Sequence, residues 1–141
     1  MTSRIDVVDD PAPCFALRHE VFVVEQGIPQ EEELDELDAV AVHLLARDGA
    51  RAIGAARVVF IEETAKIGRV CVLAQARGTG LGTALIKEAI EVARAQEGVT
   101  KVKLGAQITA MGFYEKLGFA ALGPIYLDAG LDHRDMVMDL P

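Results

Sequence analysis

The segment best suited to chemistry is a glycine-rich turn that joins an apolar run to an amphipathic one. Residues 70–83 read Val-Cys-Val-Leu-Ala-Gln-Ala-Arg-Gly-Thr-Gly-Leu-Gly-Thr. Glycines let a chain turn so that successive backbone N–H groups point into one concavity, and a helix that begins there adds roughly half a positive charge from its dipole. The turn is therefore suited to bind an anion such as a pyrophosphate.

The spacing of these glycines argues against two common nucleotide-binding motifs. A Walker loop ends in Gly-Lys-Ser/Thr, which is missing here. A dinucleotide fingerprint needs three glycines at wider spacing and a later acidic residue. The pattern that remains is Arg-x-x-Gly-x-Gly, formed by Arg77, Gly80 and Gly82. Because glycine turns also occur for purely structural reasons, a second motif must decide what this one does.

That second motif lies downstream, where residues 113–119 read Phe-Tyr-Glu-Lys-Leu-Gly-Phe. Together the two motifs resemble the GNAT superfamily of acyl-CoA-dependent N-acyltransferases, whose pyrophosphate loop has the Arg-x-x-Gly-x-Gly form. By order of elements the resemblance covers residues 41–141. It implies acetyl-CoA (coenzyme A) as the cofactor and an acetyl group transferred by direct attack of a small molecule's primary amine on the thioester.

The resemblance also implies roles for the apolar strand and the turn. Pantetheine amides pair with the open backbone edge of residues 70–72, as an added strand would. The backbone N–H of Val72 polarises the thioester oxygen, and one such donor typically contributes about 2.7–4 kcal/mol. The chemistry requires no metal. The residues expected to bind the cofactor are Val70, Cys71, Val72, Arg77, Gly78, Thr79, Gly80, Leu81, Gly82, Thr83 and Gln107.

Tyr114 is the residue expected to act as a general acid. A phenol with a pKa near 10 can supply a proton to a departing thiolate, whose thiol has a pKa near 8.5. The alternative is that Tyr114 only packs in the apolar stripe with Ala110, Phe113 and Leu117. Gln107 stands where many members of the superfamily have asparagine.

The first part of the chain carries a finer resemblance. Leu17-Arg18, residues 21–26, and Glu33-x-Asp35 followed by Asp38 resemble a small bacterial branch of the superfamily, the YjcF-like or ElaA-like proteins. The same spacing resembles the front of acyl-homoserine-lactone synthases, which share the fold. That alternative is the weaker one, because such synthases are generally longer.

The acceptor-binding candidates are Arg18, Glu25 and Glu33. Arg18 and Glu25 lie seven residues apart, hence on one face of a regular helix, where they ion-pair, line a pocket or face solvent. Among the histidines, His133 is the best candidate for a catalytic role, since residues 128–133 resemble a short motif of the same branch. A hydrogen-bonded structural histidine is the commoner case, and no general base is assigned.

Composition places these motifs in one globular domain spanning residues 1–141. The chain has 141 residues, is 51% hydrophobic and 26% charged, and carries a formal charge of −8, which argues against nucleic acid as a partner. Early charged residues argue against a signal peptide, and no run reaches the roughly 18 apolar residues of a membrane span. Two cysteines fit a reducing, cytoplasmic location. The sequence does not decide whether the protein is a monomer or a homodimer.

The pattern of elements predicts an α+β fold with a mixed, mostly antiparallel sheet and a late parallel β-α-β unit. Helical periodicity is clearest over residues 80–97, and Asp48-Gly49 is typical of a hairpin turn. The acidic residues 30–38 are expected to form a loop or a short exposed helix. The expected strands are 4–8, 41–47, 51–60, 65–73, 99–106 and two at the end of the chain, and the other expected helices are 11–26 and 110–117.

The charge is concentrated at the front of the chain. Residues 1–40 carry 11 acids and 2 bases, and residues 31–38 hold six of those acids. If this run lies beside the acceptor entrance, its field favours a cationic amine. A solubilising acidic surface is the alternative, because charge runs usually face solvent.

Two classes of function are consistent with these motifs. The first is an acetyl-CoA-dependent N-acetyltransferase. The second is a non-catalytic acyl-CoA-binding sensor or interaction module, which would bind the cofactor without turnover. The intact glycines and Tyr114 favour the enzyme.

Overall fold

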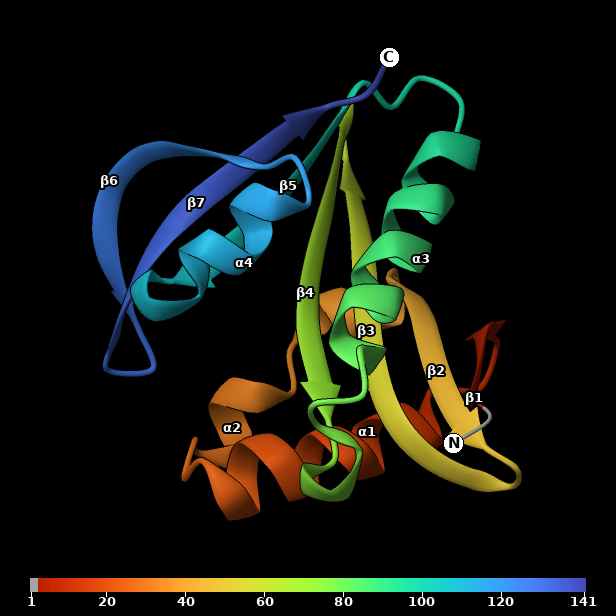
Figure 1. Ribbon diagram of the computed structural model, residues 1–141. Coiled ribbons are helices and arrows are strands. Elements are labelled where there is room, and N and C mark those ends of the chain that lie inside the picture. The colour runs from red at the N-terminus through yellow and green to blue at the C-terminus, as the bar shows by residue number, and fades with distance from the viewer. Residues whose placement is uncertain (1–2) are drawn as a thin grey trace.

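The computed structural model describes residues 3–141 and contains one seven-stranded sheet flanked by helices (Figure 1). The strand order is β1-β2-β3-β4-β5-β7-β6, and every neighbouring pair is antiparallel except β4 and β5. The expected α+β architecture with a parallel β-α-β unit is confirmed. The strands are β1 (Ser3–Val8), β2 (Val42–Asp48), β3 (Arg51–Ile61), β4 (Thr64–Val72), β5 (Lys101–Gln107), β6 (Ala120–Asp128) and β7 (Leu131–Asp139).

The long helix α3 crosses between β4 and β5, and shorter helices surround the ends of the sheet (Figure 1). None of the helices in residues 3–141 is long and apolar enough to cross a membrane. The helical elements are α1 (Ala12–Arg18), the π-helix η1 (His19–Glu25), α2 (Gln30–Glu33), the 3-10 helices η2 (Glu36–Ala39), η3 (Ala74–Ala76) and η4 (Ile108–Ala110), α3 (Leu81–Ala95) and α4 (Met111–Lys116).

Side-chain alternation along β3 separates two packing faces. A Cβ at Gly54 would lie 3.1 Å from a methyl group of Leu85 and 3.2 Å from one of Leu81, so this face of the strand packs closely under α3. Arg57 has the opposite parity along β3 and points to the other face, where it meets carboxylates of the α2–η2 segment. That second face holds the candidate site.

One helix expected from the sequence is divided in the structure. Instead of one regular helix over residues 11–26, α1 ends at Arg18 and the π-helix η1 follows directly. A π-helix bonds each residue to the fifth along the chain rather than the fourth. A spacing of seven residues therefore no longer makes two turns. Arg18 and Glu25 do not lie on one helix face, and the prediction that they do is wrong.

The sheet opens between β4 and β5. Their parallel pairing covers only residues 64–66 and 101–103, and beyond this point the two strands diverge (Figure 1). A β-bulge interrupts the β3–β4 pairing, and within it Arg69 adopts a left-handed φ of 50°. The second half of β4 is thus paired on one side and free on the other.

A buried ionic network, formed by three arginines and three carboxylates, holds the α2–η2 segment against the sheet. Arg18 is 1% exposed and binds Glu33 and Asp38, each with a shortest N–O distance of 2.7 Å. Arg57 makes a two-point contact with Asp35 and also binds Asp38 at 3.0 Å. In the next strand Arg69 binds Glu33 at 3.0 Å and Asp35 at 3.2 Å.

The network corrects the expectation that residues 30–38 are simply exposed. Glu33 is 3% exposed, and the Asp38 side chain is 8% exposed. Burial alone would raise the pKa of Asp38, but hydrogen bonds from Arg18 and Arg57 outweigh it and hold that pKa well below its usual range. A hydrogen bond from Arg57 likewise lowers the pKa of Asp35.

Replacing Arg18 with methionine should destabilise the protein strongly. The substitution removes the fully buried cation from both carboxylates, so that Asp38 keeps only Arg57 and Glu33 keeps only Arg69, and breaking a buried pair typically costs about 3–5 kcal/mol. For a domain of this size that corresponds to a drop of roughly 10 °C in melting temperature. The matched control is Arg4→Met, because Arg4 binds Asp6 with its side chain 82% exposed and should change stability little. Equal effects of the two substitutions would contradict the role of the network.

The stability gap between wild type and Arg18→Met should shrink as pH falls. Carboxylates with lowered folded-state pKa values contribute stability that is fully present above their unfolded pKa near 3.9 and is lost as pH falls through the folded value. Protonation of Asp38 removes one of the two carboxylates that Arg18 binds. Denaturant unfolding at pH 7 and at successively lower pH below 4 measures this gap, and a gap independent of pH would contradict the prediction.

Candidate active site

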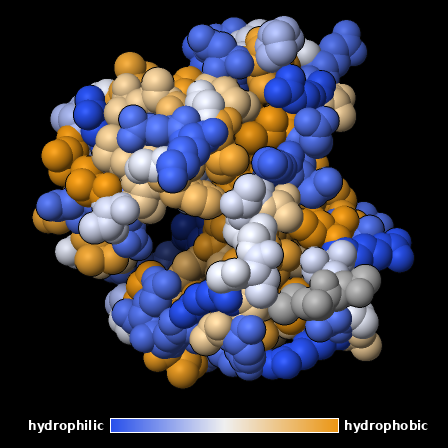
Figure 2. All heavy atoms as spheres, in the orientation of Figure 1, coloured by the Kyte–Doolittle hydropathy of each residue, from blue (hydrophilic) through white to orange (hydrophobic). Residues whose placement is uncertain are grey.

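A cavity of about 450 Å³ lies where β4 and β5 diverge. Figure 2 shows the surface hollowed at this place, beside the free side of β4. One wall comes from η1 and the α2–η2 segment, the floor from β3, β4 and β5, and the far wall from α4 and the β6–β7 hairpin. The cavity therefore joins the front of the chain to its last hairpin.

The free edge of β4 forms part of this cavity. The backbone N–H of Leu73 donates to Ile53 in β3 at 2.9 Å. Because bonding direction alternates along a regular strand, Cys71 also faces β3, whereas Val72 turns its backbone groups away from β3, toward the gap. Val70 lines the cavity. These are the groups that sequence analysis assigns to pantetheine pairing and to the thioester oxygen.

Cys71 lies beneath this edge and is 4% exposed. Burial raises the pKa of its thiol to about 12, so the thiol stays protonated at neutral pH. This environment gives Cys71 a packing role and no thiolate for acyl transfer through sulfur.

The glycine turn follows β4 and leads into α3. Gly78 and Gly80 have φ values of 79° and 86°, and Gly80 is the N-cap of α3 without a capping side chain. A Cβ at Gly78, Gly80 or Gly82 would meet nothing within 4 Å, so the concave side of the turn is open. The hydroxyl of Thr79 donates to the carbonyl of Ala76 at 2.6 Å. The first N–H groups of α3 have no partner within the helix, as an anion site requires.

Arg77 at the start of the turn is held by an ion pair that the sequence did not predict. Its two terminal nitrogens bind both carboxylate oxygens of Glu25 at 2.6 and 2.8 Å, and its Nε donates to the carbonyl of Val72 at 3.0 Å. The ion pair lowers the pKa of Glu25. Glu25 thus joins η1 to the glycine turn rather than pairing with Arg18.

Tyr114 lies on α4 and lines the cavity. Its ring packs edge-on against Phe113 and Phe119, with centroid distances of 5.0 and 6.1 Å. Burial raises its pKa, so the phenol is protonated throughout the physiological range. Both sequence-based readings of Tyr114 are compatible with this position, since the ring packs in the apolar stripe while the side chain borders the cavity.

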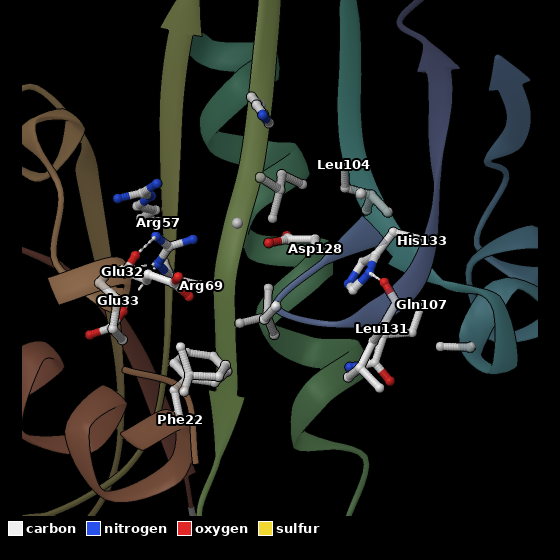
Figure 3. Close-up of a pocket in the computed structure, with 18 of the residues that line it drawn as sticks. Phe22, Glu32, Glu33, Arg57, Arg69, Leu104, Gln107, Asp128, Leu131 and His133 are labelled. Atoms are coloured by element: carbon white, nitrogen blue, oxygen red, sulfur yellow. Dashed lines mark hydrogen bonds and ion pairs between the residues drawn. The ribbon is translucent and has the colours of Figure 1, made fainter. Parts of the chain in front are cut away.

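Two further residues expected from the sequence line the same cavity as Tyr114. Gln107, at the end of β5, is paired in register with His133 of β7, and both line the cavity (Figure 3). His133 stacks on Tyr126 at a centroid distance of 6.0 Å, and its Nδ1 lies 2.8 Å from the carbonyl of Leu131. A carbonyl can only accept, so Nδ1 carries the proton and Nε2 is left with its lone pair in the neutral ring.

Tyr126 is a residue that sequence reasoning missed. Its hydroxyl donates to Asp135 at 2.7 Å, and burial followed by this contact raises its pKa. A Cβ at Gly105 would collide with the Tyr126 hydroxyl, so β5 needs glycine there for the ring to close over the strand. Asp135 also binds Lys103 at 3.3 Å. No local signal in residues 126–135 marks this contact, because the hydroxyl and the carboxylate meet only when β6 pairs with β7.

The three acceptor candidates separate in the structure. Glu33 lines the cavity, although its carboxylate is bound by Arg18 and Arg69. Arg18 lies beneath the cavity wall, within the ionic network, and Glu25 lies at the glycine turn. Because neither of the latter two lines the cavity, we withdraw them as acceptor-binding residues.

The charged residues of the cavity include several that the motifs did not single out. Figure 3 shows Arg57 and Arg69 with Glu32 and Glu33 on one side and Asp128 reaching in from the hairpin side. Lys66 of β4 also lines the cavity. Only the pairing of distant segments brings these side chains together, so no local pattern in the sequence could have identified them as a group.

Comparison with known proteins agrees with this geometry. Residues 15–140 match the family model described as an acetyltransferase (GNAT) domain. The chain is 40% identical over 126 residues to the uncharacterized N-acetyltransferase YjcF of Bacillus subtilis, covering 89% of each chain. An acyl-CoA N-acyltransferase from Pseudomonas aeruginosa superposes with a TM-score of 0.86 at 32% identity, over 97% of this chain and 98% of that one.

Escherichia coli ElaA is a further relative, as the finer resemblance predicts. Its crystal structure superposes with a TM-score of 0.84 at 27% identity, covering 97% of this chain and 98% of that one. The family match spans both the front segment and the glycine turn, so it includes every wall of the cavity. The chain belongs to the GNAT family of acetyltransferases.

Proposed function

We propose that this acetyltransferase moves an acetyl group from acetyl-CoA to the primary amine of a small molecule by direct attack on the thioester. The observation that carries the proposal is the free edge of β4, where Val70 lines one cavity with Tyr114 and the glycine turn follows at the end of the strand. An extended ligand with amides along its length and phosphates at one end matches that order of groups.

The residues present fit coenzyme A on two counts. The edge of β4 at Val70 and Val72 has no partner strand, Val70 lines the cavity, and the Val72 carbonyl accepts from Arg77, so that pantetheine amides can pair with the remaining backbone groups as an added strand does. The turn formed by residues 78–82 is open on its concave side and leads to the N-terminus of a 15-residue helix. Backbone N–H groups and the helix dipole at this point favour a pyrophosphate.

The chain supplies two groups to the reaction itself. The backbone N–H of Val72 donates to the carbonyl oxygen as negative charge develops on it, and a preorganised donor of this kind contributes about 2.7–4 kcal/mol. Tyr114, whose raised pKa keeps it protonated, gives its proton to the departing sulfur. The proton that the acylated nitrogen then loses passes through water to the phenolate and restores the phenol.

Bonds and protons balance without a further reactant. The amine nitrogen forms a bond to the carbonyl carbon, the carbon–sulfur bond breaks, and the products are an amide and a free thiol. The amine must lose one proton before attack and another after it. His133 lines the cavity, its Nδ1 is occupied by the Leu131 carbonyl, and we propose that its Nε2 accepts a proton directly or through water.

Cofactor binding should raise the melting temperature of the wild type and not that of Gly82→Glu. A ligand present at a hundred times its dissociation constant adds about 2.7 kcal/mol, or several degrees for this size. The variant places a carboxylate where the phosphates would lie, in open space and at a position with no left-handed φ. The measurement is a thermal melt with and without coenzyme A.

Gly82→Glu also controls for folding, since an acidic side chain in the first turn of α3 should leave the unliganded melting temperature unchanged or slightly raised. A wild type that shows no shift at millimolar coenzyme A, or a variant that shifts as much, would overturn the assignment of the glycine turn.

Tyr114→Phe should keep the affinity for coenzyme A and lower turnover. The ring still packs against Phe113 and Phe119, and only the hydroxyl is lost. General-acid assistance is typically worth about 10²–10⁴-fold in rate. Release of free thiol under single-turnover conditions measures the chemical step apart from product release.

Phe113→Leu is the matched packing control, because it perturbs the same aromatic cluster and leaves the Tyr114 hydroxyl in place. An unchanged rate in Tyr114→Phe would return Tyr114 to the apolar stripe. Binding of acetyl-CoA with no turnover on any amine would instead favour the sensor.

A further inference from the structure

We propose that the acceptor is an amino acid or a close analogue, with a carboxylate beside the reactive amine; this inference rests on the proposed function. The acidic front of the chain suggested a purely cationic acceptor. The structure changes that expectation, because three of the six acids in residues 31–38 are bound by Arg18, Arg57 and Arg69. These ion pairs neutralise half of the acids that would attract a cation to the cavity wall.

The charged side chains that line the cavity balance one another. The carboxylates are Glu32, Glu33 and Asp128, and the cations are Arg57, Lys66 and Arg69. A cavity with this lining has no net preference for cations or anions, but it does hold groups of both signs. It therefore suits a ligand that carries one charge of each sign.

The positive groups that are still available to bind a ligand lie on β4. Nε of Arg69 donates to the carbonyl and the carboxylate of Glu33, and its Nη2 donates to the carbonyl of Glu32 and the carboxylate of Asp35. The Arg69 side chain is 26% exposed, and its Nη1 is available to a ligand. Lys66 is exposed at the cavity and makes no ion pair within residues 3–141. Gly68 lies between them, and a Cβ there would come no closer than 4.0 Å to Arg57, so the floor is open. A carboxylate can bind here by charge-assisted hydrogen bonds.

The carboxylates that are still available to bind a ligand lie on the two walls. Asp128 points from the end of β6 into the cavity and toward the side that carries Arg69 (Figure 3). Glu32 lines the opposite wall, and neither carboxylate is ion-paired within residues 3–141. An ammonium group can bind between these walls, close to His133, before it gives up its proton.

This distribution also discriminates against other ligands. A diamine without a carboxylate would place positive charge near Lys66 and Arg69, and a dicarboxylate without an amine would meet Asp128 and Glu32. Like charges brought together in this way oppose binding of the wrong class. Acetylation removes the positive charge of the amine, so the product loses its attraction to Asp128 and Glu32.

The test compares matched acceptors and matched variants. α-Amino acids with small, aliphatic, aromatic and basic side chains are each paired with the amine that lacks only the carboxylate, and free thiol release is measured with acetyl-CoA. At least one amino acid should exceed its paired amine in kcat/KM by roughly tenfold to a hundredfold, as expected for a charge-assisted contact. Lys66→Gln should remove most of that preference by lowering kcat/KM for the amino acid and not for its paired amine, whose repulsion by Lys66 is relieved. Lys87→Gln, on the exposed side of α3, should change neither.

A second readout keeps the inference separate from catalysis. The preferred amino acid should raise the melting temperature of the coenzyme A-bound protein, and Lys66→Gln should abolish that increase while the response to coenzyme A alone stays intact. Amino acid binding without turnover would refute the proposed function and support this site. Turnover of amines and amino acids at equal rates, or no amino acid that is preferred or bound, would overturn the inference.

Discussion

The structure depends on the point where β4 and β5 stop pairing. Hydrogen bonds between the two strands cover three residues on each side, and the rest of β4 is left with a free backbone edge. Unpaired N–H and C=O groups at a sheet edge are a template for another extended chain. Here that edge faces a cavity instead of bulk solvent, which restricts what can pair with it. Everything proposed for the cofactor follows from this one interruption of the sheet.

The ionic network serves the cavity by fixing one of its walls. The α2–η2 segment consists of two short helices, which are marginal on their own, and it is rich in acids that would repel one another. Arg18, Arg57 and Arg69 neutralise three of these acids and tie them to α1, β3 and β4. A second ion pair, Arg77 with Glu25, ties η1 to the glycine turn. Arg18 and Glu25 both lie on the continuous α1–η1 segment, so this segment connects the proposed acceptor side with the proposed cofactor side.

Sequence reasoning recovered the elements because their signals are local. The apolar period of residues 81–95 and the Asp48-Gly49 turn depend only on neighbouring residues, and both gave elements close to those observed. It failed where geometry is set by distant partners. The π-helix breaks the period that paired Arg18 with Glu25, and nothing in residues 19–25 alone marks it. The partners of Tyr126 and Arg69 lie on other elements, so their contribution to the cavity appears only when the sheet is assembled.

The most direct test of where coenzyme A binds is a titration of the isotopically labelled protein with coenzyme A, followed through the backbone amide resonances. We expect large chemical-shift changes for the amides of Val70 and Val72 on the free edge of β4, and for those of Gly80 and Gly82 in the turn. Amides of β1, at the far edge of the sheet, should stay unchanged. Saturable binding that leaves the four predicted amides unmoved would contradict the central claim that this edge and this turn hold the cofactor.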